Sequence, residues 1–139
     1  MYLVDTNIIS EYRKKTKAHF GVQKFFDNVS DHDLYISVIT ISELRRGVEL
    51  IRHRSDNKQA IQLENWLDAI IQEHARNILD FTAVEAQIWG KLRVPHYENS
   101  IDKQIAATAL AHDLTVVTRN VSDFSSTGVR ILNPFQLEA

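Results

Sequence analysis

The sequence predicts an α/β fold with a mainly parallel central sheet of about five strands and helices on both faces. Short apolar runs, most of them rich in β-branched residues, alternate along the chain with longer segments that carry apolar residues at helical spacing. Strands that alternate with helices form βαβ units, which place the strands parallel. The 139 residues are enough for one domain, which we expect to span 1–139.

The first half of the chain predicts two strands and four helices. The strands are expected at 2–4 and 34–39, and the first two helices at 8–15 and 20–29. Thr40 and Glu43 have the spacing of a capping box, so a third helix should begin there. A polar break at 55–57 separates this helix from a long fourth one.

The second half predicts three further strands, at 78–81, 114–118 and 129–132. Thr82 and Glu85 again have capping-box spacing, and Pro95 should end the helix that follows them. After a loop at 94–100, another helix opens at Ser100 with an alanine-rich buried face. The stretch 120–128 is expected to be a polar loop.

The composition limits the classes of function. With 44% hydrophobic and 24% charged residues the chain is typical of globular proteins, and its net charge of -2 gives no overall basic field for nucleic acid. The absence of cysteine excludes disulfides and thiolate-based zinc sites. No apolar run reaches the length of a membrane span and no signal peptide is recognisable, so we expect a cytoplasmic protein without membrane contact.

Four acidic residues occupy comparable places in this pattern. Asp5 ends the first strand, Glu43 lies at the start of the helix after the second strand, and Asp123 follows the fourth strand. Asp102 opens the helix that leads into the fourth strand. Because parallel strands bring their carboxyl ends to one edge, these carboxylates are expected to converge there.

Converging carboxylates repel one another unless a cation neutralises them. Oxygen-only ligands favour Mg²⁺ or Mn²⁺, and such ions support hydrolysis of phosphodiesters. Each residue also has a structural interpretation, since acidic residues cap helix N-termini. For Glu43 taken alone, the capping role is the stronger interpretation.

Four stretches then resemble the motifs of PIN-domain proteins, in particular the VapC toxins and the related FitB proteins. They are 3–10 (LVDTNIIS), 36–47 (ISVITISELRRG), 102–109 (DKQIAATA) and 118–124 (TRNVSDF), and they occur in the order of that family. The resemblance covers essentially the whole chain. The segment 92–100 departs from the family by being short and lacking a glycine.

This resemblance implies a PIN-like fold and an Mg²⁺- or Mn²⁺-dependent endoribonuclease, acting as the toxin of a type II toxin–antitoxin pair that inhibits translation by cutting RNA, often tRNA. By motif position, the metal ligands are Asp5, Glu43, Asp102 and Asp123. Asn120 stands at the alternative position for the fourth ligand, and the residues expected to hydrogen-bond around the ligands are Thr6, Asn7, Thr118 and Asn120.

The resemblance also implies partners: a small antitoxin, RNA as substrate, operator DNA only through the antitoxin, and a second copy of the chain. Trp66, Trp89 and the long middle helix are candidate dimer contacts, although helical spacing favours a core position for both tryptophans. The residues that we expect to grip RNA, each with an equally strong interpretation as solvated surface, are Arg13, Lys14, Lys15, Arg45, Arg46, Arg52 and Arg54.

Two alternatives remain at this stage. A catalytically weak PIN-like module could act mainly through an antitoxin complex on operator DNA. Other enzymes or signalling domains on a doubly wound sheet, such as dehalogenase-type phosphatases and receiver domains, are disfavoured. The former would need an Asp at position 7, which is Asn, and the latter an acidic pair that is missing.

Overall fold

A computed structural model describes residues 1–137 and contains a parallel sheet with the strand order β3-β2-β1-β4-β5. All four neighbouring pairs are parallel, as predicted. The strands are short and their bounds are β1 Tyr2–Val4, β2 Leu34–Ser37, β3 Ile78–Leu79, β4 Thr115–Val117 and β5 Ile131–Leu132.

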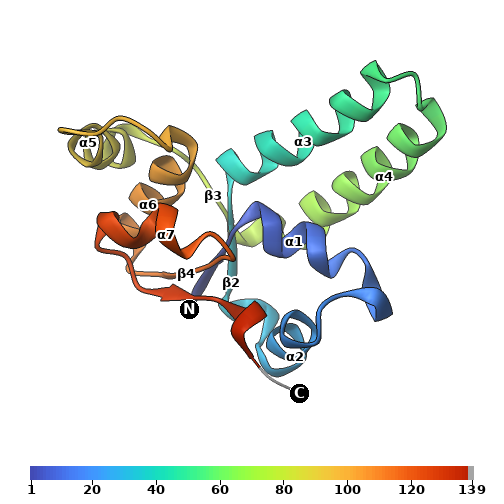
Figure 1. Cartoon of the computed structure of the whole chain (residues 1–139), viewed down its shortest axis with the longest axis horizontal. Helices are drawn as coiled ribbons and strands as arrows, with labels where there is room; N and C mark the ends of the chain where they lie inside the picture. The colour runs from blue at the N-terminus through green and yellow to red at the C-terminus, as the bar shows by residue number, and fades with distance from the viewer. Residues whose placement is uncertain (138–139) are drawn as a thin grey trace.

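The helices connect these strands and cover both faces of the sheet (Figure 1). Their bounds are α1 Thr6–Tyr12, α2 Phe20–Asn28, α3 Val38–His53, α4 Asn57–Glu73, α5 Ala83–Leu92, α6 Ser100–His112 and α7 Val121–Phe124. The long helices α3 and α4 pack side by side and project as an arm, as the green ribbons in Figure 1 show. No helix within residues 1–137 is long and apolar enough to cross a membrane.

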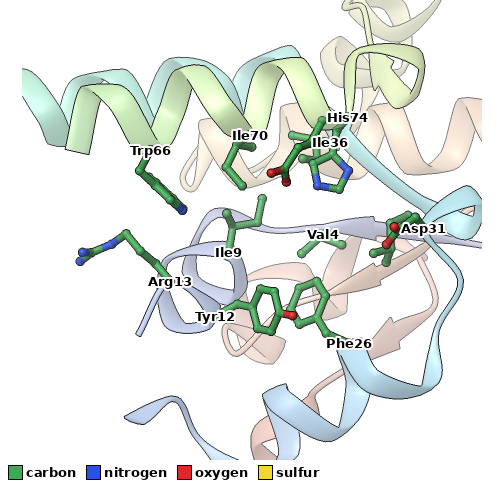
Figure 2. Close-up of a pocket in the computed structure, with 12 residues that line it drawn as sticks. Val4, Ile9, Tyr12, Arg13, Phe26, Asp31, Ile36, Trp66, Ile70 and His74 are labelled. Atoms are coloured by element: carbon green, nitrogen blue, oxygen red, sulfur yellow. The ribbon is translucent and has the colours of Figure 1, made fainter. Parts of the chain in front are cut away.

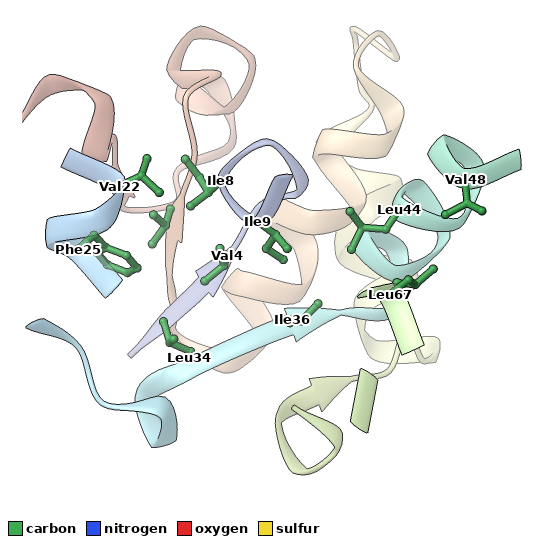
Figure 3. Packing of buried hydrophobic residues seen from close by; sticks show 11 residues of the cluster. Val4, Ile8, Ile9, Val22, Phe25, Leu34, Ile36, Leu44, Val48 and Leu67 are labelled. Atoms are coloured by element: carbon green, nitrogen blue, oxygen red, sulfur yellow. The ribbon is translucent and has the colours of Figure 1, made fainter. Parts of the chain in front are cut away.

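The alternation of side chains along β1 builds two cores. Val4 points to the face covered by α1, α2, α3 and α4, where it packs with Ile9, Ile36 and Leu44 (Figure 3). Leu3 points to the other face and packs with residues of α6 and α7, including Ile105. Burial of these apolar side chains on both faces explains why β1 is an uninterrupted apolar run in the sequence.

The start of α3 differs from the prediction. The helix begins at Val38 and not at Thr40, because the hydroxyl of Ser37 accepts a hydrogen bond from the backbone N–H of Ile39 (3.0 Å) and caps it. Thr40 is fully buried inside the helix. The capping-box interpretation of Thr40 and Glu43 is therefore wrong, and Glu43 is not needed as a cap.

Other boundaries move by one to three residues, and one loop is structured. The predicted polar loop 120–128 contains the short helix α7 and a 3₁₀ turn. The predicted capping box before α5 is confirmed, since the Glu85 carboxylate accepts from both the backbone N–H and the hydroxyl of Thr82. The loop before α6 is also confirmed.

Candidate active site at the carboxyl edge of the sheet

Asp5 lies at the end of the central strand β1 and is 3% exposed. One carboxylate oxygen accepts the backbone N–H of Thr6 (2.8 Å), which caps the N-terminus of α1. The other oxygen accepts from the hydroxyl of Thr118 (2.8 Å) and the side-chain amide of Asn7 (3.3 Å). Three donors from two parts of the chain therefore fix the orientation of this buried carboxylate.

The residues expected to hydrogen-bond around the ligands form one connected set. Asn7 bridges the ends of β1 and β4, because its amide also approaches the hydroxyl of Thr118 (3.4 Å) and its carbonyl accepts the backbone N–H of Arg119 (3.2 Å). The backbone N–H of Asn120 donates to the Thr118 hydroxyl (3.0 Å). Thr6 contributes its backbone N–H and not its hydroxyl.

The other three carboxylates come from separate helices. Glu43 lies in the second turn of α3, Asp102 in the first turn of α6, and Asp123 in α7. Asp102 and Asp123 lie close enough to share a hydrogen bond when one of them carries a proton. A pocket of about 320 Å³ at this edge is lined by Asp5, Thr6, Asn7, Glu43, Ile101, Asp102, Ile105 and Asn120. All four predicted acids are thus brought to one place.

Burial and neighbouring charges raise the pKa values of Asp102 and Asp5. Partial burial, followed by the negative charges of Asp5 and Asp123, the hydrogen bond to Asp123 and the charge of Glu43, raises the pKa of Asp102 to about 7. Burial also raises the pKa of Asp5, and the donors Thr118, Thr6 and Asn7 partly oppose that effect by stabilising its charged form. Among the residues that the structure describes, no ion pair involves these four carboxylates.

The chemistry of this donor set fits a hard divalent cation. Four carboxylates supply only oxygen ligands, as Mg²⁺ and Mn²⁺ prefer, and a cation would relieve the repulsion that acts on Asp102. Within residues 1–137, however, no three His, Asp or Glu side chains are already arranged around a single ion position. Asp5 is the carboxylate of this set whose orientation is defined by hydrogen bonds.

Two residues whose role here the sequence analysis did not predict fix the beginning of α6, which carries Asp102. The indole N–H of Trp89 in α5 donates to the carbonyl of Ser100 (3.0 Å). Lys103 is only 5% exposed, and its ammonium donates to the carbonyl of His96 in the preceding loop. A lysine placed three residues before Ala106, on the apolar face of the predicted helix, was the available signal for this contact.

The basic residues predicted to grip RNA differ in whether they already pair with other side chains. Arg45 and Arg52 on α3 share Glu64 of α4 at 2.5 Å and 3.2 Å, and both also contact Glu49. Lys14 pairs with Glu11 (2.9 Å). The Arg13 guanidinium lies 5.7 Å from the centre of the Trp66 ring. Lys15, Arg46 and Arg54 are exposed. Arg45 and Arg52 thus already serve to join α3 to α4.

A larger cleft of about 420 Å³ lies on the face covered by α1, α2 and α4 (Figure 2). Its wall is mostly apolar and aromatic, with Ile9, Tyr12, Phe26 and Ile70 among its residues. Tyr12 and Phe26 stack at a centroid distance of 3.9 Å. Charged and titratable side chains also line the cleft, namely Arg13, Asp31, Glu73 and His74, so its wall combines apolar surface with polar groups.

Comparisons with known proteins agree with this geometry. The family model of the PIN domain matches residues 2–129. The toxin FitB of Neisseria gonorrhoeae is 34% identical, over 97% of this chain and 99% of FitB. The VapC ribonuclease Y4jK of Sinorhizobium fredii is 30% identical, over 98% of this chain and 99% of that protein.

Solved structures extend the likeness to the backbone. The crystal structure of FitAcB from Neisseria gonorrhoeae superposes with a TM-score of 0.88 at 34% identity, covering 99% of this chain and 100% of that chain. The structure of FitAB bound to a DNA fragment superposes with a TM-score of 0.82 at 33% identity, covering 100% and 99%. The chain therefore belongs to the PIN-domain family, in the group that includes FitB and the VapC ribonucleases.

Proposed function

We propose that this protein is a metal-dependent endoribonuclease and the toxin of a toxin–antitoxin pair, which inhibits translation by cutting RNA, with tRNA as the expected class. The observation that carries the proposal is the convergence of four carboxylates from separate elements: Asp5, Glu43 and Asp102 line one pocket, and Asp123 lies near enough to act on Asp102. The names of the relatives support it, since FitB is a toxin and Y4jK a ribonuclease.

The four carboxylates would hold Mg²⁺ or Mn²⁺, which when bound activates water and offsets charge on the leaving oxygen of a phosphodiester. The protein's own contribution is orientation. Thr118 and Asn7 hold the Asp5 carboxylate in one position before any cation arrives. Trp89 and Lys103 do the same for the first turn of α6, which presents Asp102. No His side chain lines the pocket within residues 1–137.

The partner in this proposal is a small antitoxin. FitA is present with FitB in the FitAB structure, which is bound to DNA. The apolar cleft between α1, α2 and α4 suits the apolar face of an amphipathic antitoxin segment (Figure 2). The antitoxin would then contact operator DNA, and this chain would be held there only indirectly.

We also propose a homodimer, with a contact surface different from the expected tryptophans. Trp66 packs against the core on the α1–α4 face, and Trp89 binds the start of α6. Val94 and Tyr97, in the loop before α6, are 76% and 75% exposed and are better placed to meet a second copy.

The test is cleavage of labelled total tRNA by purified, antitoxin-free protein with Mg²⁺, Mn²⁺ or EDTA. Asp5→Asn should retain the fold, because an asparagine oxygen can still cap α1, and should lose metal-dependent cutting. Asp27→Asn, which removes an exposed carboxylate on α2, is the matched control and should cut like the wild type. Full activity of Asp5→Asn would refute the site. If the wild type neither cuts nor binds Mg²⁺ in calorimetry, the alternative of a catalytically weak binding module is preferred.

A further inference from the structure

Arg119 occupies a special place beside the acidic pocket. It lies just after β4, between Thr118, which holds Asp5, and Asn120, which lines the pocket. Its backbone N–H donates to the side-chain carbonyl of Asn7 (3.2 Å), and the Asn7 amide in turn binds Asp5 (3.3 Å). The Arg119 backbone is therefore part of the hydrogen-bonded set that orients the central carboxylate.

The side chain of Arg119 is exposed and rests on an aromatic ring. Its guanidinium carbon lies 4.4 Å from the centre of the Phe135 ring. Phe135 belongs to a 3₁₀ turn, Pro134–Gln136, that follows the carboxyl end of β5. The imidazole of His19, at the start of α2, packs against the same ring at 4.8 Å. A stacked guanidinium keeps its N–H groups, which lie in its own plane, available for an incoming ligand.

Arg13 and Arg93 also lie over aromatic rings, those of Trp66 (5.7 Å) and Trp89 (3.6 Å), whereas three other arginines pair with acidic side chains. Arg45 and Arg52 pair with glutamates of the α3–α4 arm, and Arg130 pairs with Asp113 (2.9 Å). In the part of the chain that the structure describes, the Arg119 guanidinium makes no ion pair or side-chain hydrogen bond. Its guanidinium is thus a positively charged fork whose donors lack an acceptor within residues 1–137, and its backbone lies at the carboxyl edge of the sheet next to Asn120, which lines the pocket.

Electrostatics indicate what this fork would bind. A polyanion that approaches four carboxylates is repelled, so a cation at the rim of the pocket is needed to hold the backbone. A guanidinium matches the geometry of a phosphate through two parallel N–H···O bonds. Building on the proposed ribonuclease function, we infer that Arg119 binds a phosphate of the RNA strand that flanks the bond cut in the acidic pocket.

The inference is tested by RNA binding and by cleavage in one set of variants. The variants are Arg119→Gln, Arg119→Lys and, as the matched control, Arg76→Gln. Arg76 is also exposed, but it precedes β3 at the opposite edge of the sheet. Binding is measured on labelled total tRNA in EDTA over a series of salt concentrations, and cleavage of the same pool in Mg²⁺ gives KM and kcat.

Loss of one phosphate contact should weaken binding by Arg119→Gln about three- to tenfold and lower the slope of log Kd against log salt by about 0.7 to 0.9. KM should rise, while Mg²⁺ binding in calorimetry stays as in the wild type. Arg119→Lys should recover part of the affinity, because it restores the charge without the fork. Arg76→Gln should match the wild type throughout.

The outcomes separate the two proposals. If wild-type protein binds and cuts RNA but Arg119→Gln retains the full salt slope and KM, or if Arg76→Gln loses as much, the assignment of Arg119 is overturned and the ribonuclease stands. If Arg119→Gln loses Mg²⁺ binding, the residue supports the pocket and does not contact RNA. If the wild type shows neither salt-dependent RNA binding nor cutting, both proposals fall.

Discussion

Replacing Asp102 by asparagine should stabilise the metal-free protein. The pKa of this carboxyl is raised from 3.8 to about 7, by partial burial and by Asp5, Asp123 and Glu43. A raised pKa means that the folded state binds the proton more tightly than the unfolded state. The resulting penalty on folding is absent below the ordinary pKa, grows as pH rises, and is complete above about pH 7. The amide of the Asp102→Asn variant carries no charge and therefore escapes this penalty.

The size of the stabilisation follows from the difference between the ordinary and the raised pKa of Asp102. A pKa difference of about 3 corresponds to about 4 kcal/mol as an upper limit. Because the carboxyl is only half-buried, solvent screening reduces this to about 2 kcal/mol. Loss of an acidic group from the first turn of α6 costs about 0.5 kcal/mol through the helix dipole. The net gain of about 1.5 kcal/mol should raise Tm by about 5 °C.

The assay is urea and thermal unfolding in EDTA, at about pH 8, where the wild-type penalty is complete, and at about pH 5, where only about a third of it is present. The variant should exceed the wild type clearly at the higher pH and only slightly at the lower one. Asp27→Asn, on the exposed face of α2, should change little at either pH. Added Mg²⁺ should stabilise the wild type alone. Equal or lower stability of the Asp102→Asn protein at about pH 8, with an unchanged urea m-value, would show that the carboxylates do not repel one another as described.

Two further predictions concern the cation and the C-terminal turn. Asp102 must lose its proton to bind Mg²⁺, so the apparent Mg²⁺ affinity measured by calorimetry should be full above about pH 7. Below that pH the affinity should fall by up to about tenfold per pH unit. An affinity that is constant across this range would contradict the raised pKa of Asp102. Gly21→Ala should destabilise the protein by about 2 kcal/mol or more in urea unfolding, because the new Cβ would lie 1.8 Å from the backbone carbonyl oxygen of Pro134. Gly47→Ala, whose Cβ would have nothing within 4 Å, should instead stabilise α3 by about 1 kcal/mol. Equal effects at the two sites would refute the close approach of Gly21 to Pro134.

The fold and the acidic pocket were predictable because both follow from periodicity and topology. Buried parallel strands are continuous apolar runs, and their carboxyl ends must share an edge, so the placement of Asp5 and Asp123 required only the strand assignments. The start of α3 was missed for a local reason. Ser37 and Thr40 are both good caps by sequence, and only the end of the pairing between β2 and its neighbours decides which one is used.

The basic surface was less predictable, because helical periodicity says which side chains are exposed but not which charges pair. The sequence alone gives Arg45 and Arg52 no obvious partner on the next helix, yet Glu64 of α4 forms ion pairs with both. Their pairing with Glu64 depends on how α3 and α4 pack, which no local pattern encodes.

Arg119 is a second basic residue whose surroundings depend on tertiary packing. In the sequence it is a single arginine between two polar residues, without a basic cluster to mark it. Its position becomes informative only when β5 and the turn after it bring Phe135 beneath its guanidinium, beside a site that repels phosphate. A site that must bind both a cation and a polyanion needs its positive charge at the rim and not among the carboxylates, where an arginine would neutralise the ligands. In the proposed function, Arg119 would hold the RNA strand and the four acids would hold the metal, so the positive charge and the metal ligands would have separate places.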